Sequence, residues 1–140
     1  MSAEGVTVFF YGLFMDPSLL ATKGVSPSKA TVGCVDNYRL RIGRRATLVP
    51  SDGSRAYGVL MTLRADDVRA LYSDDSVADY VAEPVSVVLP DGTVESAVCY
   101  NLPEHGLEGA SSEYAKSLLM LAGRLGLPEE YLQEIREQLA

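Results

Sequence analysis

The residues best suited to chemistry in this sequence are aspartates that gather just past the middle of the chain. Residues 73–76 read Ser-Asp-Asp-Ser, and Asp79 and Tyr80 follow closely. A carboxylate serves as a general base when partial burial brings its pKa toward the working pH and when it reaches the proton that it removes. The same composition is typical of a solvated loop that ends a helix, and the residues alone leave both interpretations open.

A second candidate site is the loop between an amino-terminal strand and the helix that follows it. The run Val6–Tyr11 is β-branched and aromatic, whereas Asp16 and Pro17 are typical of a helix start. Backbone N–H groups at the start of a helix are unpaired and, together with the helix dipole, favour an anion. The loop from Tyr11 to Met15 therefore suits a carboxylate or the oxyanion of a reacting carbonyl group. The alternative is a strand end that only packs into the core.

Other chemically active side chains are few. His105 is the single histidine, and no Gly-x-Ser-x-Gly motif accompanies it. Cys34 and Cys99 do not form a Cys-x-x-Cys pair and have no histidine at ligand spacing. We therefore expect His105 to be a solvated loop residue, the two thiols to be buried and free rather than bridged, and no zinc site.

Composition and charge narrow the range of partners. The 140 residues include 12 Lys+Arg and 19 Asp+Glu, a formal net charge of -7. An acidic chain repels phosphate backbones and anionic lipid heads, so neither nucleic acid nor a membrane surface is expected as a partner. No apolar run approaches the roughly 20 residues of a spanning helix, and residues 1–5 lack the pattern of a secretory signal. We expect a cytoplasmic protein with a single domain over residues 1–140.

Hairpins are expected in the middle of the chain and helices toward its ends. The expected strands are Val6–Tyr11, Tyr38–Ile42, Ala46–Val49, Ala56–Leu63, Val85–Leu89 and Val94–Tyr100. A turn at 50–54 joins the third of these strands to the fourth as a hairpin, and a turn at 90–93 joins the last two. In Tyr38–Ile42, alternation places Arg39 and Arg41 together on one face, where they are either a solvated pair or an attraction for an acidic ligand.

Helices are expected in four places: after Asp16, around Val68, Leu71 and Tyr72, from near Ser111 to Gly126, and from Pro128 onward with an apolar stripe of Leu132, Ile135 and Leu139. This order of elements predicts an α+β protein, in which a small antiparallel β-barrel-like sheet is flanked by helices.

Several segments, taken in order along the chain, follow the pattern of one known family. The loop at 11–15, Tyr-Gly-Leu-Phe-Met, is similar to a Tyr-Gly-Ser-Asn-(Leu/Met) loop, and residues 57–60, Tyr-Gly-Val-Leu, match a strand in which an aromatic residue and a glycine precede valine. The further matching segments are 32–40, 46–50, Tyr80, Val85, Val87, Tyr100, Tyr114 and 126–131. On these residues the chain resembles the gamma-glutamylcyclotransferase-like family over nearly its whole length.

The resemblance implies a β-barrel-like α+β fold and an enzyme that converts a γ-glutamyl amine or γ-glutamyl-amino acid to 5-oxoproline with release of the amine. Such a transferase or lyase reaction belongs to glutathione metabolism. The resemblance further implies a small-molecule substrate, no metal or redox cofactor, and pairing into a homodimer. In the family a glutamate moves a proton between the attacking α-amine and the leaving nitrogen, and its position falls on Asp75.

The substrate-binding residues that the resemblance implies are Tyr11, Gly12, Leu13, Phe14, Met15, Tyr80 and Tyr114. The structural alternatives are a half-buried strand residue for Tyr80 and core packing for Tyr114. Leu13 and Phe14 replace the family's serine and asparagine, so side-chain hydrogen bonds from these positions are lost.

The catalytic position also departs from the family pattern. Asp75 has one methylene less than glutamate, which moves a carboxylate by on the order of 1 Å, and Ser76 replaces the family's glycine. Asp74 and Asp79 are therefore alternative bases. Three functions remain open: an active cyclising enzyme, a catalytically impaired module that binds γ-glutamyl or amino-acid ligands, and a related enzyme that removes a γ-glutamyl group from another amide.

Overall fold

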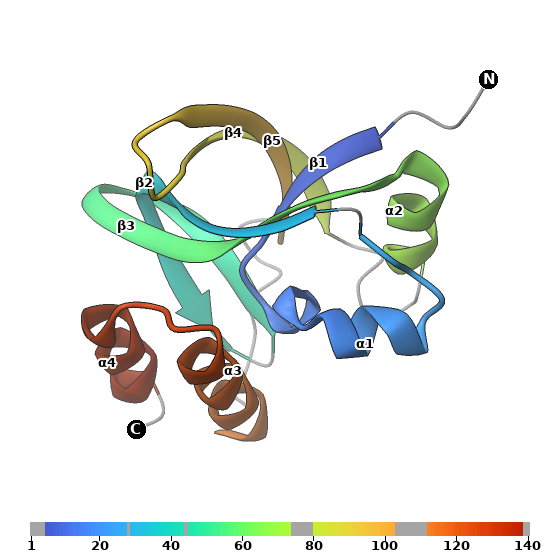
Figure 1. The fold of residues 1–140 in the computed structure, drawn as a ribbon. Helices are drawn as coiled ribbons and strands as arrows, with labels where there is room; N and C mark the ends of the chain where they lie inside the picture. The colour runs from blue at the N-terminus through green and yellow to red at the C-terminus, as the bar shows by residue number, and fades with distance from the viewer. Residues whose placement is uncertain (1–4, 28, 44, 74–79, 103–111, 139–140) are drawn as a thin grey trace.

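Five strands close into a barrel, with the strand order β1-β3-β2-β4-β5 (Figure 1). The computed structural model describes residues 5–27, 29–43, 45–73, 80–102 and 112–138. The strands are β1 (Gly5–Phe10), β2 (Lys29–Ile42), β3 (Ala46–Arg64), β4 (Val81–Val88) and β5 (Val94–Asn101). The helices are the 3-10 turn η1 (Leu13–Met15), α1 (Pro17–Thr22), α2 (Ala65–Leu71), α3 (Ser112–Arg124) and α4 (Glu129–Glu137).

The predicted α+β class, with a small antiparallel β-barrel-like sheet and flanking helices, is confirmed. Every neighbouring pair of strands is antiparallel except β1 and β5, which close the barrel in parallel at Val8 and Val98. The predicted hairpin of β4 and β5 is also present. The helices α3 and α4 lie side by side at one end of the barrel (Figure 1).

The first predicted hairpin is wrong. Residues 46–49 and 56–63 belong to one continuous strand, β3, and both halves pair with β2 rather than with each other. In the first half Leu48 lies opposite Leu40, and in the second half Val59 lies opposite Val32. The strand β2 also begins well before Tyr38, at Lys29, so the alternation over Tyr38–Ile42 detected only its last part.

The turn-forming residues at 50–54 produce an irregularity instead of a chain reversal. The register of β2 and β3 shifts between Asp36 and Tyr38, around Asn37, which has a φ of 66°. The Asn37 Oδ1 atom accepts a hydrogen bond of 3.1 Å from the backbone N–H of Gly53, whose φ is 80°. Glycine and asparagine tolerate this left-handed conformation, so the same residues that favour a turn can form a β-bulge.

The helix after the first strand begins as predicted. The Asp16 carboxylate accepts a hydrogen bond of 2.9 Å from the backbone N–H of Ser18, and Pro17 occupies the first helical position. This capping satisfies one of the unpaired donors of the helix start. Gly24, with a φ of 76°, follows the end of α1. The cap therefore determines the direction in which α1 leaves the loop after β1.

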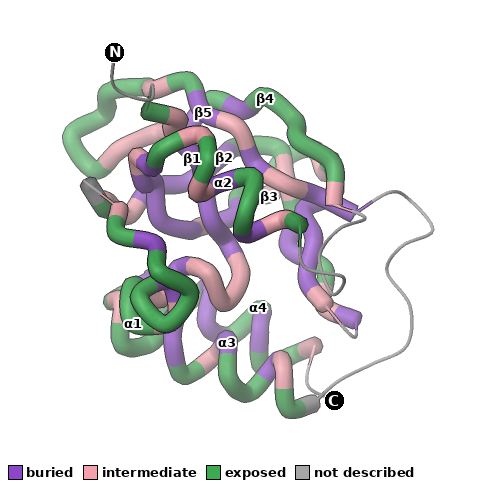
Figure 2. The backbone as a smooth tube through the Cα atoms, turned by 90° about the vertical axis from the view of Figure 1, so that its right-hand side faces the viewer, coloured by how far each residue is buried: buried purple, intermediate pink, exposed green. Residues whose placement is uncertain are grey.

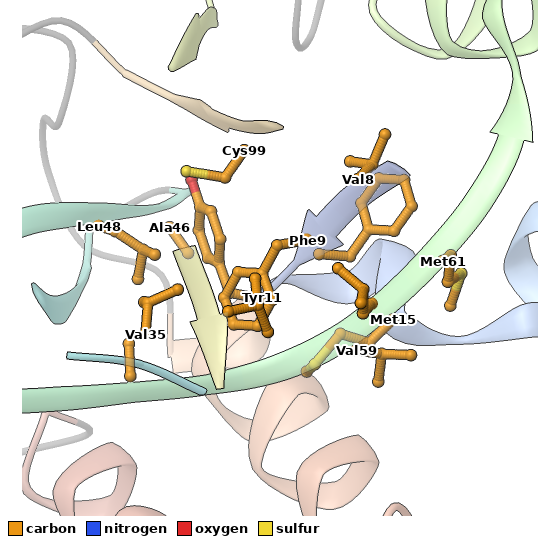
Figure 3. Packing of buried hydrophobic residues seen from close by; sticks show 14 of the residues in the cluster. Val8, Phe9, Tyr11, Met15, Val35, Ala46, Leu48, Val59, Met61 and Cys99 are labelled. Carbon is orange, nitrogen blue, oxygen red and sulfur yellow. The ribbon is translucent and has the colours of Figure 1, made fainter. Parts of the chain in front are cut away.

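The core fills the barrel and continues onto the inner faces of α3 and α4 (Figure 2). Figure 3 shows Phe9 and Tyr11 packed among buried strand residues, with Cys99 near the Tyr11 hydroxyl. The expected helical stripes are buried at Val68 and Leu71 in α2 and at Leu132 and Ile135 in α4. Leu139 lies outside the described residues.

The structure also places the cysteines and the pair of arginines singled out in the sequence. Cys34 and Cys99 are free and buried, as predicted. Arg39 and Arg41 are exposed, whereas Leu40 between them is buried. His105 lies outside the described residues. Among the helices in the described ranges, none has the length and apolar character needed to cross a membrane.

Candidate functional site

A cavity of about 380 Å³ lies where the end of β1, the loop after it and the ends of several other elements meet. Its size is within the range of small-molecule sites, roughly 300–1,000 Å³. The lining residues are Phe9, Phe10, Tyr11, Gly12, Leu13, Phe14, Leu19, Lys23, Arg45, Ala46, Leu71, Tyr72, Tyr80, Tyr100 and Tyr114. They come from segments distant in sequence, so the closed barrel and its helices together create the cavity.

The loop after β1 is in direct contact with Tyr114 of α3. A Cβ atom on Gly12 would lie only 2.8 Å from the Tyr114 hydroxyl oxygen, so the absence of a side chain permits this approach. The Tyr114 oxygen accepts a hydrogen bond from the backbone N–H of Leu13. One amide of the loop is therefore paired with a phenol that itself faces the cavity.

Tyr114 remains protonated over the physiological range. Burial raises the pKa of its phenol to about 12, although the Leu13 N–H and the positive charge of Arg45 act in the opposite direction. A neutral phenol that accepts a bond from Leu13 can still donate its own O–H group to a ligand. Tyr114 is therefore suited to donating a hydrogen bond and not to acting as a base.

Two other tyrosines of the cavity donate their hydroxyl protons to the backbone. The Tyr11 hydroxyl donates to the carbonyl oxygen of Tyr100 at 2.5 Å, and the Tyr80 hydroxyl donates to the carbonyl oxygen of Ala46 at 2.6 Å. Burial raises the pKa of Tyr11 well above its usual value, so its phenol also stays neutral. These bonds connect β1 to β5 and the segment before β4 to the start of β3.

Five aromatic side chains of the cavity form one network of ring contacts centred on Tyr72, and we call them the aromatic wall: Phe10, Phe14, Tyr72, Tyr80 and Tyr100. Phe14 meets Phe10 and Tyr72 edge to face, with ring centroids 5.9 and 5.7 Å apart. Tyr72 stacks on Tyr100 at 4.0 Å and 15°, and its centroid lies 6.0 Å from that of Tyr80. Such contacts hold the rings in place, so the wall has a defined shape.

The charged residues at the cavity are cations. The Arg45 guanidinium carbon lies 5.4 Å from the centroid of the Tyr80 ring, and its side chain is half-buried. Lys23, just after α1, is the second cation. Among the described residues that line the cavity, none is aspartate or glutamate. The described part of the lining therefore attracts an anionic ligand.

Most of the residues expected to bind substrate are brought together here. Tyr11, Gly12, Leu13, Phe14, Tyr80 and Tyr114 all line the cavity. Met15 instead is 1% exposed and packs in the core beneath the loop. Asp74, Asp75 and Asp79 lie outside the described residues, in the segment between Tyr72 and Tyr80.

Nine of the described lining residues are not among the site residues that the sequence predicts, and those with polar or charged side chains are Lys23, Arg45, Tyr72 and Tyr100. Tyr72 was expected in a helix and Tyr100 in a strand, and nothing in either pattern distinguishes a cavity wall from a core. The exposed pair Arg39 and Arg41, considered for an acidic ligand, does not line the cavity. The described residues contain no group of three histidine, cysteine or acidic side chains suited to a metal ion.

Comparisons with known proteins bear on the fold and the family. A family model described as Gamma-glutamyl cyclotransferase, AIG2-like, matches residues 8–117. Among solved structures, a gamma-glutamyl cyclotransferase is similar at 22% identity, with 95% of this chain and 87% of that chain covered and a TM-score of 0.79. An uncharacterized protein from Homo sapiens matches at 21% identity with 95% and 87% covered, again with a TM-score of 0.79.

A third structure, YkqA from Bacillus subtilis, is 19% identical, with 97% of this chain and 54% of that chain covered and a TM-score of 0.79. No curated protein matches the chain significantly. At these identities the structures establish the fold, while the family model, which spans most of the chain, establishes the family. The protein thus belongs to the gamma-glutamyl cyclotransferase, AIG2-like family.

Proposed function

We propose that the protein cyclises a γ-glutamyl amine or a γ-glutamyl-amino acid to 5-oxoproline and releases the free amine. The observation that carries this proposal is the cavity on the loop of Tyr11 and Gly12, with Tyr72 and Tyr80 in its wall. Residues 74–79, which include Asp75, join these two tyrosines in the sequence. The chain therefore enters and leaves the aspartate segment at the cavity.

The proposed reaction is an intramolecular acyl transfer. The α-amine of the glutamyl group attacks its own γ-carbonyl carbon, so a new C–N bond closes the ring while the bond to the leaving nitrogen breaks. One proton passes from the attacking nitrogen to the leaving nitrogen, and a carboxylate that accepts and returns it balances the reaction. Because the glutamyl chain is flexible, holding it in a folded shape is a large part of the catalytic task.

The described residues support the positioning steps. The positive charge of Arg45 at the cavity attracts the α-carboxylate of the substrate. The neutral phenol of Tyr114, whose pKa is raised to about 12 by burial, donates a hydrogen bond to a substrate oxygen. The oxyanion that develops at the γ-carbon is one such acceptor, and a donor aimed at it stabilises the transition state.

The proton-transfer role is assigned to Asp75, with Asp74 and Asp79 as alternatives. None of the described lining residues offers a carboxylate. The segment 74–79 follows Ser73 and precedes the lining residue Tyr80 in the sequence, which supports it as the source of the base. Asp75 is the position that matches the family glutamate. Because the Asp75 side chain is one methylene shorter than that of glutamate, the rate depends most strongly on whether its carboxylate reaches the substrate nitrogen.

The test is 5-oxoproline formation by the purified protein from γ-glutamyl amino acids, γ-glutamyl amines and glutathione, beside Asp75→Ala and Asp74→Ala. We expect turnover that is lost in Asp75→Ala and retained in Asp74→Ala. Turnover that persists in Asp75→Ala would move the base to Asp74 or Asp79. Absence of turnover with every substrate would contradict the enzymatic proposal.

The second candidate function is a module that binds γ-glutamyl or amino-acid ligands without converting them. The observation that favours it is the composition of the described lining, which is aromatic and cationic and includes apolar Leu13 and Phe14 at the loop. Calorimetric binding of glutamate or 5-oxoproline, in the absence of any turnover, would support this alternative. Turnover that depends on an aspartate would exclude it.

The cellular setting is also a proposal. The net charge of -7 supports a small-molecule ligand in preference to nucleic acid or an anionic membrane. We propose a cytoplasmic location, a place in glutathione metabolism and pairing into a homodimer. Sedimentation analysis tests the oligomeric state, and the substrate panel above tests the metabolic assignment, since glutathione and other γ-glutamyl compounds are compared directly.

A further inference from the structure

The side of the cavity formed by Phe14 differs in character from a site that accepts any leaving amine. Phe14 is half-buried, lines the cavity, and contacts both Phe10 and Tyr72 edge to face. Its ring is thus part of the aromatic wall instead of turning toward solvent. A glutamyl group is short and polar and buries little of such a surface. An apolar part of the ligand would gain more free energy by packing against the wall.

The contacts within the aromatic wall favour a flat group. Tyr72 and Tyr100 stack nearly in parallel, and Phe14 and Tyr80 meet Tyr72 at steep angles. Rings that are fixed in this way present faces and edges at which another ring can pack without rearrangement. Aromatic pairs of this kind gain stability beyond that of the apolar area they bury.

The described cations of the cavity favour a carboxylate on the leaving group. Arg45 and Lys23 are the charged residues of the described lining, and both attract an anion. The guanidinium of Arg45 lies over the Tyr80 ring and is assigned to the α-carboxylate of the glutamyl group. Lys23 is then the cation that attracts a carboxylate on the leaving group.

We propose that the released amine carries a planar aromatic ring, and that Phe14 is the residue that selects it. This inference rests on the proposed function, since it names the substrate class of the same site. Two sources share this chemistry, an aromatic amino acid and an arylalkylamine. The ring, packed against Phe14 and Tyr72, orients the scissile amide relative to the loop.

The test compares γ-glutamyl-phenylalanine, γ-glutamyl-phenethylamine, γ-glutamyl-alanine and γ-glutamyl-lysine by kcat/KM for 5-oxoproline formation. We expect both aromatic substrates to exceed the alanine substrate by about tenfold or more, the size of discrimination that apolar pockets give for small differences in side chain. The lysine substrate, whose side chain is long but has no ring, should fall below both aromatic substrates. The ratio of kcat/KM for γ-glutamyl-phenylalanine to that for γ-glutamyl-phenethylamine reports whether a carboxylate on the leaving group is also bound.

The role of Phe14 is tested with Phe14→Asn and Phe14→Leu. We expect Phe14→Asn to reduce the preference for aromatic substrates to within about threefold, with Phe14→Leu between it and the unmodified protein. Met120→Asn is the matched control, because Met120 is a large apolar residue that is 69% exposed and does not line the cavity. Thermal unfolding checks that each variant is folded. If Phe14→Asn does not fold, the kcat/KM values of Phe14→Leu test the role of Phe14.

Binding measurements test the preference for an aromatic ring independently of enzymatic turnover. Calorimetry with γ-glutamyl-phenylalanine and γ-glutamyl-alanine measures the preference even if neither compound is turned over, and we expect an affinity ratio of about tenfold. Equal affinities would overturn the inference whether or not the protein is an enzyme. A full aromatic preference in folded Phe14 variants would overturn the role of Phe14, and a lysine substrate as good as the aromatic substrates would overturn the preference for a ring.

Discussion

The phenolic oxygen of Tyr114 lies 2.8 Å from the position that a Cβ atom on Gly12 would occupy. The helix α3 and the loop after β1 are thus in contact through a backbone that has no side chain at this point. The same phenol accepts the N–H of Leu13, so a side chain at position 12 has to displace it from that amide. The site therefore depends on glycine for a packing reason and not for a left-handed conformation.

We predict that Gly12→Ala lowers kcat/KM for 5-oxoproline formation about tenfold and stability by about 1 kcal/mol, because the Tyr114 ring must shift by a few tenths of an ångström. Chemical denaturation and steady-state kinetics measure the two effects. Combining Gly12→Ala with Tyr114→Phe should restore part of the stability but not the rate. Gly123→Ala is the control, since nothing lies within 4 Å of its added Cβ atom. A Gly12→Ala protein that equals the unmodified protein in both measurements would contradict the packing argument.

Gly58→Ala should be more damaging than Gly12→Ala. A Cβ atom on Gly58 would lie 2.2 Å from the carbonyl oxygen of Phe10 and 2.9 Å from the ring of Phe9. A backbone atom in a paired strand cannot turn aside as a side chain can, so we expect a loss of about 3 kcal/mol or more. Urea denaturation provides the value. A loss no larger than that of Gly12→Ala would show that β1 and β3 can separate at this point.

Arg45→Gln should raise the KM for γ-glutamyl substrates about tenfold while kcat changes less, because the arginine supplies attraction for a substrate carboxylate. Arg41→Gln is the matched control: Arg41 is exposed and lies away from the cavity, and its KM should stay within about twofold of the unmodified value. Added salt should weaken binding to the unmodified protein more than to Arg45→Gln. Equal effects of the two substitutions would assign the attraction to the overall charge of the protein.

Asp75→Glu tests whether the length of the carboxylate side chain limits the reaction. If the aspartate reaches the proton from a position about 1 Å short, the longer residue should raise kcat by about tenfold or more. Asp74→Glu adds the same methylene one position away and should leave kcat unchanged. The rate of 5-oxoproline release under saturating substrate is the measurement. A fall in kcat with Asp75→Glu would mean that the backbone is already adapted to aspartate.

Stability should fall steeply at alkaline pH. Burial raises the pKa of Tyr11, Tyr72 and Tyr114 in the folded protein above the value of 10.0 for an exposed tyrosine, and that of Cys99 from 9.0 to about 12. Above pH 10 the unfolded chain therefore loses protons that the folded chain retains. The stabilisation is complete below about pH 9 and decreases by about 1.4 kcal/mol per pH unit for each tyrosine that titrates only on unfolding.

Urea denaturation between pH 8 and about pH 11.5 measures this dependence. Replacing the phenol in Tyr114→Phe should reduce the slope by the contribution of one tyrosine, because its pKa of about 12 is well above the unfolded value. A stability that does not change over this interval would indicate that water reaches these phenols in the folded state.

The sequence by itself determined the elements whose signals are local. Asp16 with Pro17 starts α1, the Pro-Asp-Gly-Thr turn at 90–93 joins β4 to β5, and the apolar stripe at Leu132 and Ile135 is the buried face of α4. Each of these features depends on residues a few positions apart, where capping, turn geometry and helical periodicity act directly. The order of motifs along the chain was also sufficient for the family and the fold class.

Tertiary structure alone decided how β2 and β3 pair and what surrounds the cavity. The residues at 50–54 satisfy a turn and a bulge equally well, and the hydrogen bond from Gly53 to Asn37, 16 residues away, selects the bulge. Likewise Arg45 before β3, Tyr72 after α2 and Tyr100 in β5 are distant in sequence, and only the folded barrel brings them together with the loop at Gly12. Such contacts have no periodicity along the chain, because they arise from the packing of segments distant in sequence.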